Sequence, residues 1–246
     1  MSEVHVHGLV PAAERTDIPS AEVRRVTHGD VAALVTDAEP GRIAASSVLR
    51  THWRVLEEAG ATATVLPVRF GTLMAGDRAV ADEFLAPRHD RLAAGLAELA
   101  GKVQLTVKGF FEEEALMRDV VETSPAIARM RESVRGLPEA ATYYQRIELG
   151  QLVAAEVERA RERDTALVLE RLEPLAVAAT REPPATADSA VNAAFLVERK
   201  RVDEFSAAVG RLERELAGRV RIRYVGPLPP YSFAGDDATA GDGAWA

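Results

Sequence analysis

The apolar residues of the C-terminal half recur with a period that switches between two and about 3.6, and the order of these switches limits the fold. A period of two is typical of a half-buried strand, and the longer period is typical of an amphipathic helix. The expected elements are a strand at 103–107, helices at 124–135 and about 139–172, strands at 175–180 and 190–197, a helix at 201–217 and a strand from 220. Since the run at 190–197 is almost wholly apolar, we expect a central strand buried on both faces.

This order of strand, helix, strand, strand, helix and strand is that of the split βαβ, or ferredoxin-like, fold. In that fold two crossover helices cover one face of a four-stranded antiparallel sheet. We therefore predict a two-domain α+β protein. Its C-terminal domain is expected to be ferredoxin-like and to comprise residues 101–234, with the domain boundary near Gly101.

Residues 1–100 are expected to form a separate α+β domain that begins with a small antiparallel sheet. Three short runs rich in β-branched residues supply its strands, at 4–10, 23–28 and 31–35. Gly29 and Asp30 separate the last two runs, which is typical of a hairpin turn.

Two helices complete this predicted domain. The first is expected at 46–59 and to stop at Gly60, and the second at 77–100, where Pro87 should break or kink it. The segment 65–74 contains prolines and glycine, so we expect an edge strand or an extended loop. The Gly-rich, acidic residues 235–246 are expected to form a flexible tail.

The composition opposes several classes of function. The chain has 246 residues, a formal net charge of −8 at pH 7 and no cysteine. Negative charge opposes nucleic-acid binding, because affinity for phosphates comes from clustered Lys and Arg. The lack of cysteine removes thiolate nucleophiles, iron–sulfur clusters and cysteine zinc sites. No signal-peptide pattern and no long uncharged apolar run is present, so we expect a cytoplasmic protein that does not span a membrane.

Four stretches of the sequence carry a family resemblance. They are VHVHGLVP at 4–11, LPVRFGT at 66–72, YYQRIELG at 143–150 and VGPLPPYSF at 225–233. The last is the most specific, because three prolines beside two aromatic residues form an extended element with little freedom to vary. Together they cover nearly the whole chain except the tail, and they resemble the gas vesicle protein F/L family.

The resemblance implies an α+β N-terminal domain, a ferredoxin-like C-terminal domain with an enlarged helical insertion, and a role in making gas vesicles. It implies a non-enzymatic accessory or minor structural protein of the cytoplasm and the vesicle, whose partners are the main shell protein and other accessory gas vesicle proteins. Strand addition to a sheet edge and an amphipathic helix in a groove are both open as binding modes. A ferredoxin-like small-molecule sensor or an enzyme with a nonstandard site is the alternative.

Candidate ligand sites are few. His5 and His7 lie two apart on a predicted strand and could both reach a metal ion, but no nearby cluster of Asp, Glu or Cys completes a site. Packing in the sheet is therefore the favoured interpretation, and His52 on an apolar helix face is interpreted in the same way. Motifs for phosphate loops, zinc proteases, dinucleotides and nucleophile elbows are absent. We expect no catalytic or metal-binding residue and no cofactor.

Charged and aromatic residues supply the candidate contacts between the domains or with a partner. Arg69 and Phe70 lie in the rigid segment between Pro67 and Gly71, and Arg69 could form a bidentate ion pair there. Three alternating arginines on the last strand form either a solvated face or a docking stripe for an acidic partner: Arg219, Arg221 and Arg223.

The proline-rich segment has two open interpretations. It could be an arm that binds a partner, or an internal clasp whose aromatic side chains pack between the domains. We favour the clasp. Its candidate residues are Pro229, Pro230, Tyr231 and Phe233.

Overall fold

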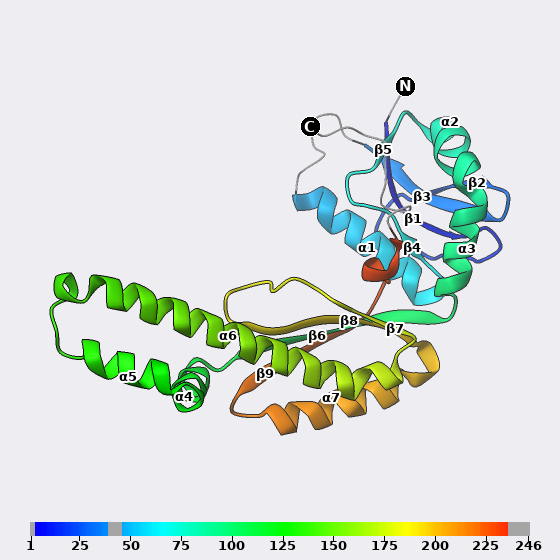
Figure 1. Ribbon diagram of the computed structural model, residues 1–246. Coiled ribbons are helices and arrows are strands. Elements are labelled where there is room, and N and C mark those ends of the chain that lie inside the picture. The colour runs from blue at the N-terminus through cyan, green and yellow to red at the C-terminus, as the bar shows by residue number, and fades with distance from the viewer. Residues whose placement is uncertain (1–2, 39–45, 236–246) are drawn as a thin grey trace. The chain divides into compact units, whose positions relative to one another are not determined.

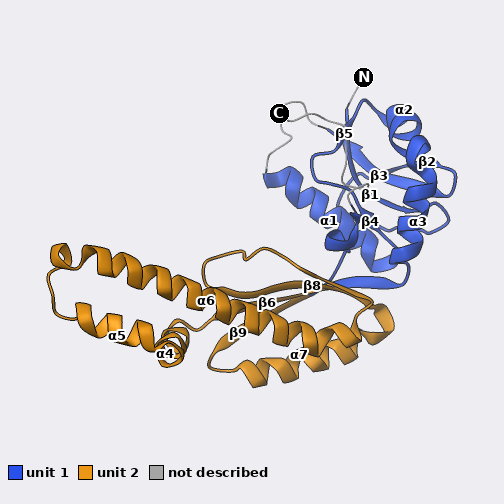
Figure 2. Cartoon of the chain, viewed as in Figure 1, with its two compact units in different colours: residues 1–104, 226–246 blue, residues 105–225 orange. Residues whose placement is uncertain are grey.

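The computed structural model describes residues 3–38 and 46–235. Its backbone contacts divide the chain into two compact units, residues 1–104 with 226–246 and residues 105–225, which we call unit 1 and unit 2 (Figure 2). Both units combine helices with a sheet of antiparallel pairs, so the prediction of an α+β protein is confirmed.

The sheet of unit 1 is built around its first strand. Its strands are β1 (Val4–Pro11), β2 (Arg24–His28), β3 (Val31–Asp37), β4 (Leu66–Pro67) and β5 (Leu73–Met74). The strand order is β2-β3-β1-β4, β5 also pairs with β1, and every one of these pairs is antiparallel (Figure 1). The predicted hairpin is present, with Gly29 at a φ of 59° in its turn. The expected edge segment forms only the two short strands β4 and β5.

The helices of unit 1 follow the prediction with one correction. They are α1 (Ser46–Thr62), α2 (Asp77–Ala79) and α3 (His89–Leu99), with a π-turn at Val80–Leu85 and a 3-10 turn at Ala86–Arg88 between the last two. The second predicted helix is thus interrupted around Pro87, as expected. The stop expected at Gly60 is wrong, because α1 continues through it to Thr62. Gly60 lies against Pro229, and a Cβ there would be in ordinary contact with the proline ring at 3.6 Å.

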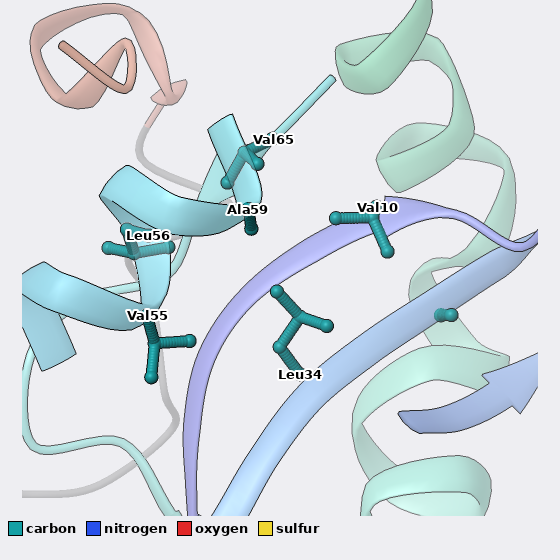
Figure 3. Packing of buried hydrophobic residues seen from close by; sticks show 7 residues of the cluster. Val10, Leu34, Val55, Leu56, Ala59 and Val65 are labelled. Atoms are coloured by element: carbon teal, nitrogen blue, oxygen red, sulfur yellow. The ribbon is translucent and has the colours of Figure 1, made fainter. Parts of the chain in front are cut away.

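One apolar cluster joins α1 to the sheet of unit 1. Its buried side chains come from β1, β3, α1 and the residues after α1, and they include Val10, Leu34, Val55, Leu56, Ala59 and Val65 (Figure 3). Gly8 of β1 permits this packing, because a Cβ at Gly8 would lie 2.5 Å from the Leu56 side chain. The half-buried ring of Tyr231 packs against the same cluster.

Unit 2 contains a second sheet with long helices. Its elements are β6 (Lys102–Phe111), α4 (Glu113–Thr123), α5 (Pro125–Val134), α6 (Tyr143–Leu172), β7 (Ala178–Arg181), β8 (Ser189–Glu198), α7 (Val202–Leu216) and β9 (Val220–Leu228), with 3-10 turns at Glu139–Ala141, Glu173–Leu175 and Arg199–Arg201. The strand order is β7-β8-β6-β9, so β8 is central, as its apolar run predicted. Figure 1 shows α6 and α7 on one face of this sheet.

Two features of unit 2 differ from expectation. The sequence predicted no helix between the first strand and residue 124, whereas α4 occupies 113–123. α4 buries Leu116 and Val120, which lie four residues apart on one helix face. The backbone contacts also group residues from 226 onward with unit 1 rather than unit 2. The expected domain of residues 101–234 stays a prediction. The expected tail falls outside the described residues, except for Gly235.

Candidate functional site: the C-terminal arm and the histidines of unit 1

β9 runs to Leu228, and the residues from 226 onward group with unit 1; we call residues 226–233 the arm. Its two central prolines, Pro229 and Pro230, are buried. A 3-10 turn follows at Tyr231–Phe233, in which the Phe233 amide donates to the carbonyl of Pro230 at 3.0 Å. The Ser232 amide donates to Oε1 of Gln104 at 2.9 Å. The arm is therefore an ordered part of unit 1.

Tyr231 carries most of the contacts of the arm. Its ring centroid lies 4.8 Å from that of Trp53 and 6.0 Å from that of His52, both on α1. Its hydroxyl is hydrogen-bonded to Nε2 of His52 and lies 3.4 Å from the carbonyl oxygen of Val68. Tyr231 thus connects α1, the segment after β4 and the arm within unit 1.

The hydrogen bond to Tyr231 is one end of a buried chain of side chains. Nδ1 of His52 lies 3.1 Å from Nδ1 of His7, and Nε2 of His7 lies 2.9 Å from Oγ1 of Thr36. His7 stands where the pairing of β1 with β3 shifts register, between Val6 and Gly8. A bulge of this kind re-aims a side chain, which explains why His7 reaches both neighbours. The chain runs Thr36–His7–His52–Tyr231 and crosses β3, β1, α1 and the arm.

Burial keeps both imidazoles of this chain neutral. His7 and His52 have only 1% and 2% of their surface exposed. Burial lowers the pKa of His7 to about 3, with further lowering by His52 and His5, and burial lowers the pKa of His52 to about 4, with further lowering by His5. The pKa of Tyr231 is raised by burial. At pH 7 the chain therefore consists of neutral donors and acceptors.

Neutral imidazoles satisfy every position of the chain in two ways. In one, the Tyr231 hydroxyl donates to His52, His52 donates from Nδ1 to His7, and His7 donates from Nε2 to Thr36. In the other, all three donors are reversed and the Tyr231 hydroxyl donates to the Val68 carbonyl. Because all four ring nitrogens and the Tyr231 hydroxyl have a partner in either arrangement, the chain specifies how the arm seats on α1.

His5 and His7 do lie near each other, with ring centroids 6.3 Å apart. Burial also lowers the pKa of His5, an effect that Glu3 opposes. Among the described residues no group of three or more His, Asp or Glu side chains is placed to hold a metal ion. The sequence treated His7 and His52 as separate packing residues and missed their pairing. The sequence did contain one indication of this pairing, because His7 lies on a strand and His52 on a helix face that are both expected to pack into the core of the same domain.

The LPVRFGT stretch borders this site. Val68 and Phe70 contact it, and the ring of Phe70 meets that of His52 edge-on at 5.4 Å. Arg69 itself is exposed, and its carbonyl accepts hydrogen bonds from the Thr72 amide at 3.2 Å and the Thr72 hydroxyl at 2.8 Å. The role predicted for its guanidinium stays a prediction, while its backbone closes the turn that presents Phe70.

The three arginines near β9 have different surroundings. Arg219 forms an ion pair with Asp164, a carboxylate of α6 that is 2% exposed. Arg221 lies 3.5 Å from Glu112 and over the ring of Phe110, and Arg223 is exposed. Arg219 and Arg221 therefore have partners inside unit 2, and a docking stripe for an acidic partner stays a prediction.

The YYQRIELG stretch forms an exposed apolar patch at one end of unit 2. It begins α6 where this helix pairs with α5, and Tyr144 is 82% exposed. Four large apolar side chains make up this patch, which we call the hairpin tip: Leu137, Tyr143, Tyr144 and Ile147. Exposed patches of this kind mark contact sites for other proteins.

Fold and site together define an α+β protein with two antiparallel sheets and a C-terminal arm that returns to the first of them. The family model of the gas vesicle synthesis protein GvpL/GvpF matches residues 4–235, so the chain belongs to the GvpL/GvpF family.

Individual relatives cover most of the chain. It is 37% identical over 215 residues to gas vesicle protein F of Streptomyces sp. (strain CB03234), covering 87% of this chain and 89% of the relative. The crystal structure of GvpF from Anabaena sp. PCC7120 is similar with a TM-score of 0.79 and 26% identity, over 96% of this chain and 99% of that chain. GvpF from Microcystis aeruginosa gives a TM-score of 0.74 at 26% identity, over 96% and 100%. No helix in the described part of the chain is long and apolar enough to cross a bilayer.

Proposed function

We propose that this protein is a non-enzymatic accessory or minor structural protein of gas vesicle assembly, which binds the main shell protein and other accessory gas vesicle proteins in the cytoplasm and at the vesicle. The observation that carries the proposal is the family match over residues 4–235. A shell subunit that faces gas must present apolar surface, and before assembly such a surface aggregates unless a partner covers it. A folded protein with exposed apolar side chains of its own is suited to that task.

The hairpin tip is the surface on which we expect the shell protein to bind. Its side chains are large, apolar and exposed; Tyr143, Tyr144 and Ile147 lie on α6, and Leu137 lies in the segment that joins α5 to α6. Aromatic side chains such as Tyr143 and Tyr144 add contact area at a low cost in conformational entropy.

Capture of purified shell protein by the immobilised chain tests this proposal. We expect Tyr144→Ser together with Ile147→Ser to weaken capture at least tenfold without changing the melting temperature. Met117→Ser on α4 is the matched control, because Met117 is also exposed and lies in the same unit. Equal capture by both variants would exclude the tip, and failure of the unaltered chain to bind the shell protein would contradict the function itself.

We also propose that unit 2 is ferredoxin-like with α4 and α5 as the helical insertion, and that a domain boundary lies near Gly101. The support for the first is the order of elements and the strand order β7-β8-β6-β9. We propose further that the arm is a clasp rather than a free partner-binding segment, supported by the contacts of Tyr231 in unit 1. The part of the clasp hypothesis that joins the two domains stays a prediction.

A further inference from the structure

The surroundings of the buried chain disfavour a positive charge on His7 or His52. Among the described residues, the titratable groups that face His7 and His52 are His5 from β1 and Tyr231 from the arm, and neither supplies a negative charge at neutral pH. Glu3 acts on His5, and Asp37 at the end of β3 is ion-paired with Arg24. A proton taken up by His7 or His52 is therefore buried without a carboxylate partner.

The hydrogen bonds of the chain also limit how many protons it can hold. One added proton leaves the hydrogen bonds satisfied, because a single imidazolium can donate from both ring nitrogens while the other imidazole accepts, but its charge is buried and therefore disfavours the seated arm. Two added protons do not fit, because two Nδ1–H groups would then face each other at 3.1 Å. Acid thus favours any opening that brings at least one of the two rings into water.

Three elements that bury the two imidazoles are β1, α1 and the arm. Of these, the arm can move away with the smallest loss of structure. His7 belongs to β1, which pairs with β3 on one side and with β4 and β5 on the other. His52 belongs to α1, whose neighbouring side chains Val55 and Leu56 are fully buried in the core. Beyond β9, the arm is joined to the rest of unit 1 by the hydrogen bonds of Tyr231 to His52 and Val68 and of the Ser232 amide to Gln104.

We propose that the Thr36–His7–His52–Tyr231 chain is an acid-sensitive latch that holds the arm on α1 at neutral pH and releases it when His52 is protonated. Release uncovers the His52 ring and the part of the Trp53 ring against which Tyr231 packs. The latch is thus a conformational device built into unit 1, and it goes beyond the proposed role in assembly.

The size of the effect follows from the two protonation equilibria of His52. Its pKa is about 4 with the arm seated, and it returns toward the usual 6.5 once the ring meets water. Proton uptake by His52 alone then raises the equilibrium constant for arm release by about 20-fold between pH 7 and pH 5. Release occurs at a higher pH than loss of the whole sheet because it breaks fewer contacts.

Amide hydrogen exchange of the arm measures this equilibrium directly. The protection factor of an amide, its intrinsic exchange rate divided by its observed rate, reports the opening equilibrium after the intrinsic pH dependence is removed. We expect the protection factors of the Ser232 and Phe233 amides to fall about 20-fold from pH 7 to pH 5. Amides in the centre of α7, in unit 2, should keep their protection over this range.

Variants assign the change to His52. In His52→Gln the pH dependence of arm protection should fall below twofold. In His89→Gln, which replaces a partly exposed histidine outside the buried chain, it should stay at about 20-fold. If His52→Gln already loses arm protection at pH 7, Tyr231→Phe is the replacement variant. It should lower the protection factors at pH 7 and at pH 5 and leave the ratio between them unchanged. A wild-type arm with pH-independent protection, or an equal pH effect in His52→Gln, would overturn the latch.

Discussion

Removal of the Tyr231 hydroxyl isolates the contribution of the hydrogen-bonded chain to the stability of unit 1. Tyr231→Phe keeps the ring that packs on Trp53 but leaves Nε2 of the buried His52 without its partner. A lost hydrogen bond with an orphaned buried group costs about 2 kcal/mol. Tyr231→Ala also removes the ring from the apolar cluster and should cost about 4 kcal/mol. Urea unfolding followed by Trp53 fluorescence, with Trp245 replaced by Phe, gives both values.

Tyr224→Phe in unit 2 is the matched control. Its hydroxyl lies 3.0 Å from Oγ of Ser206, and that oxygen also donates to the carbonyl of Val202 at 2.8 Å. Because Ser206 keeps a partner, the control should cost about 0.5–1 kcal/mol, measured on the unfolding of unit 2 by circular dichroism. A Tyr231→Phe cost no larger than that of the control would refute the idea that the chain fastens the arm.

Two further predictions concern charge. His7 and His52 bind protons more readily in the unfolded chain, where their pKa is near 6.5, than in the folded chain. The free energy of unfolding should therefore be highest above about pH 7 and should fall as the pH drops. We expect a loss of about 4 kcal/mol between pH 8 and pH 5, measured by urea unfolding of unit 1. Arg219→Ala leaves the buried Asp164 carboxylate without its ion-pair partner and should cost about 3 kcal/mol in thermal melts, whereas Arg223→Ala on the exposed position should cost less than about 0.5 kcal/mol.

Local patterns predicted the elements of the fold well, because burial of one or both faces leaves a period in the sequence. The run at 190–197 is a central strand, and the interruption near Pro87 lies where proline chemistry places it. Helix α4 was missed because its first residues, Glu113 and Glu114, were interpreted as part of a polar, solvated stretch, although Leu116 and Val120 have helical spacing. Gly60 was mistaken for a helix stop because sequence does not show that another segment packs against it.

The candidate site depended on information that no local pattern contains. His7 and His52 are 45 residues apart, and His52 and Tyr231 are 179 apart, so only the folded chain brings them into hydrogen-bond contact. The aromatic residues of the arm could be selected from sequence because prolines fix the backbone around them. The residues that these aromatic side chains contact could not be selected from sequence, because nothing in the proline-rich segment specifies which side chains of unit 1 it packs against.

Gas vesicle formation with and without this chain is the most direct test of its function. A complete set of gas vesicle proteins would be produced in a cell that makes no vesicles of its own, and vesicles would be counted by electron microscopy and by the loss of light scattering under pressure. We expect vesicles when this chain is present and few or none when it is omitted, with recovery when it is supplied again. Vesicles of normal number and shape in its absence would contradict a role in their assembly.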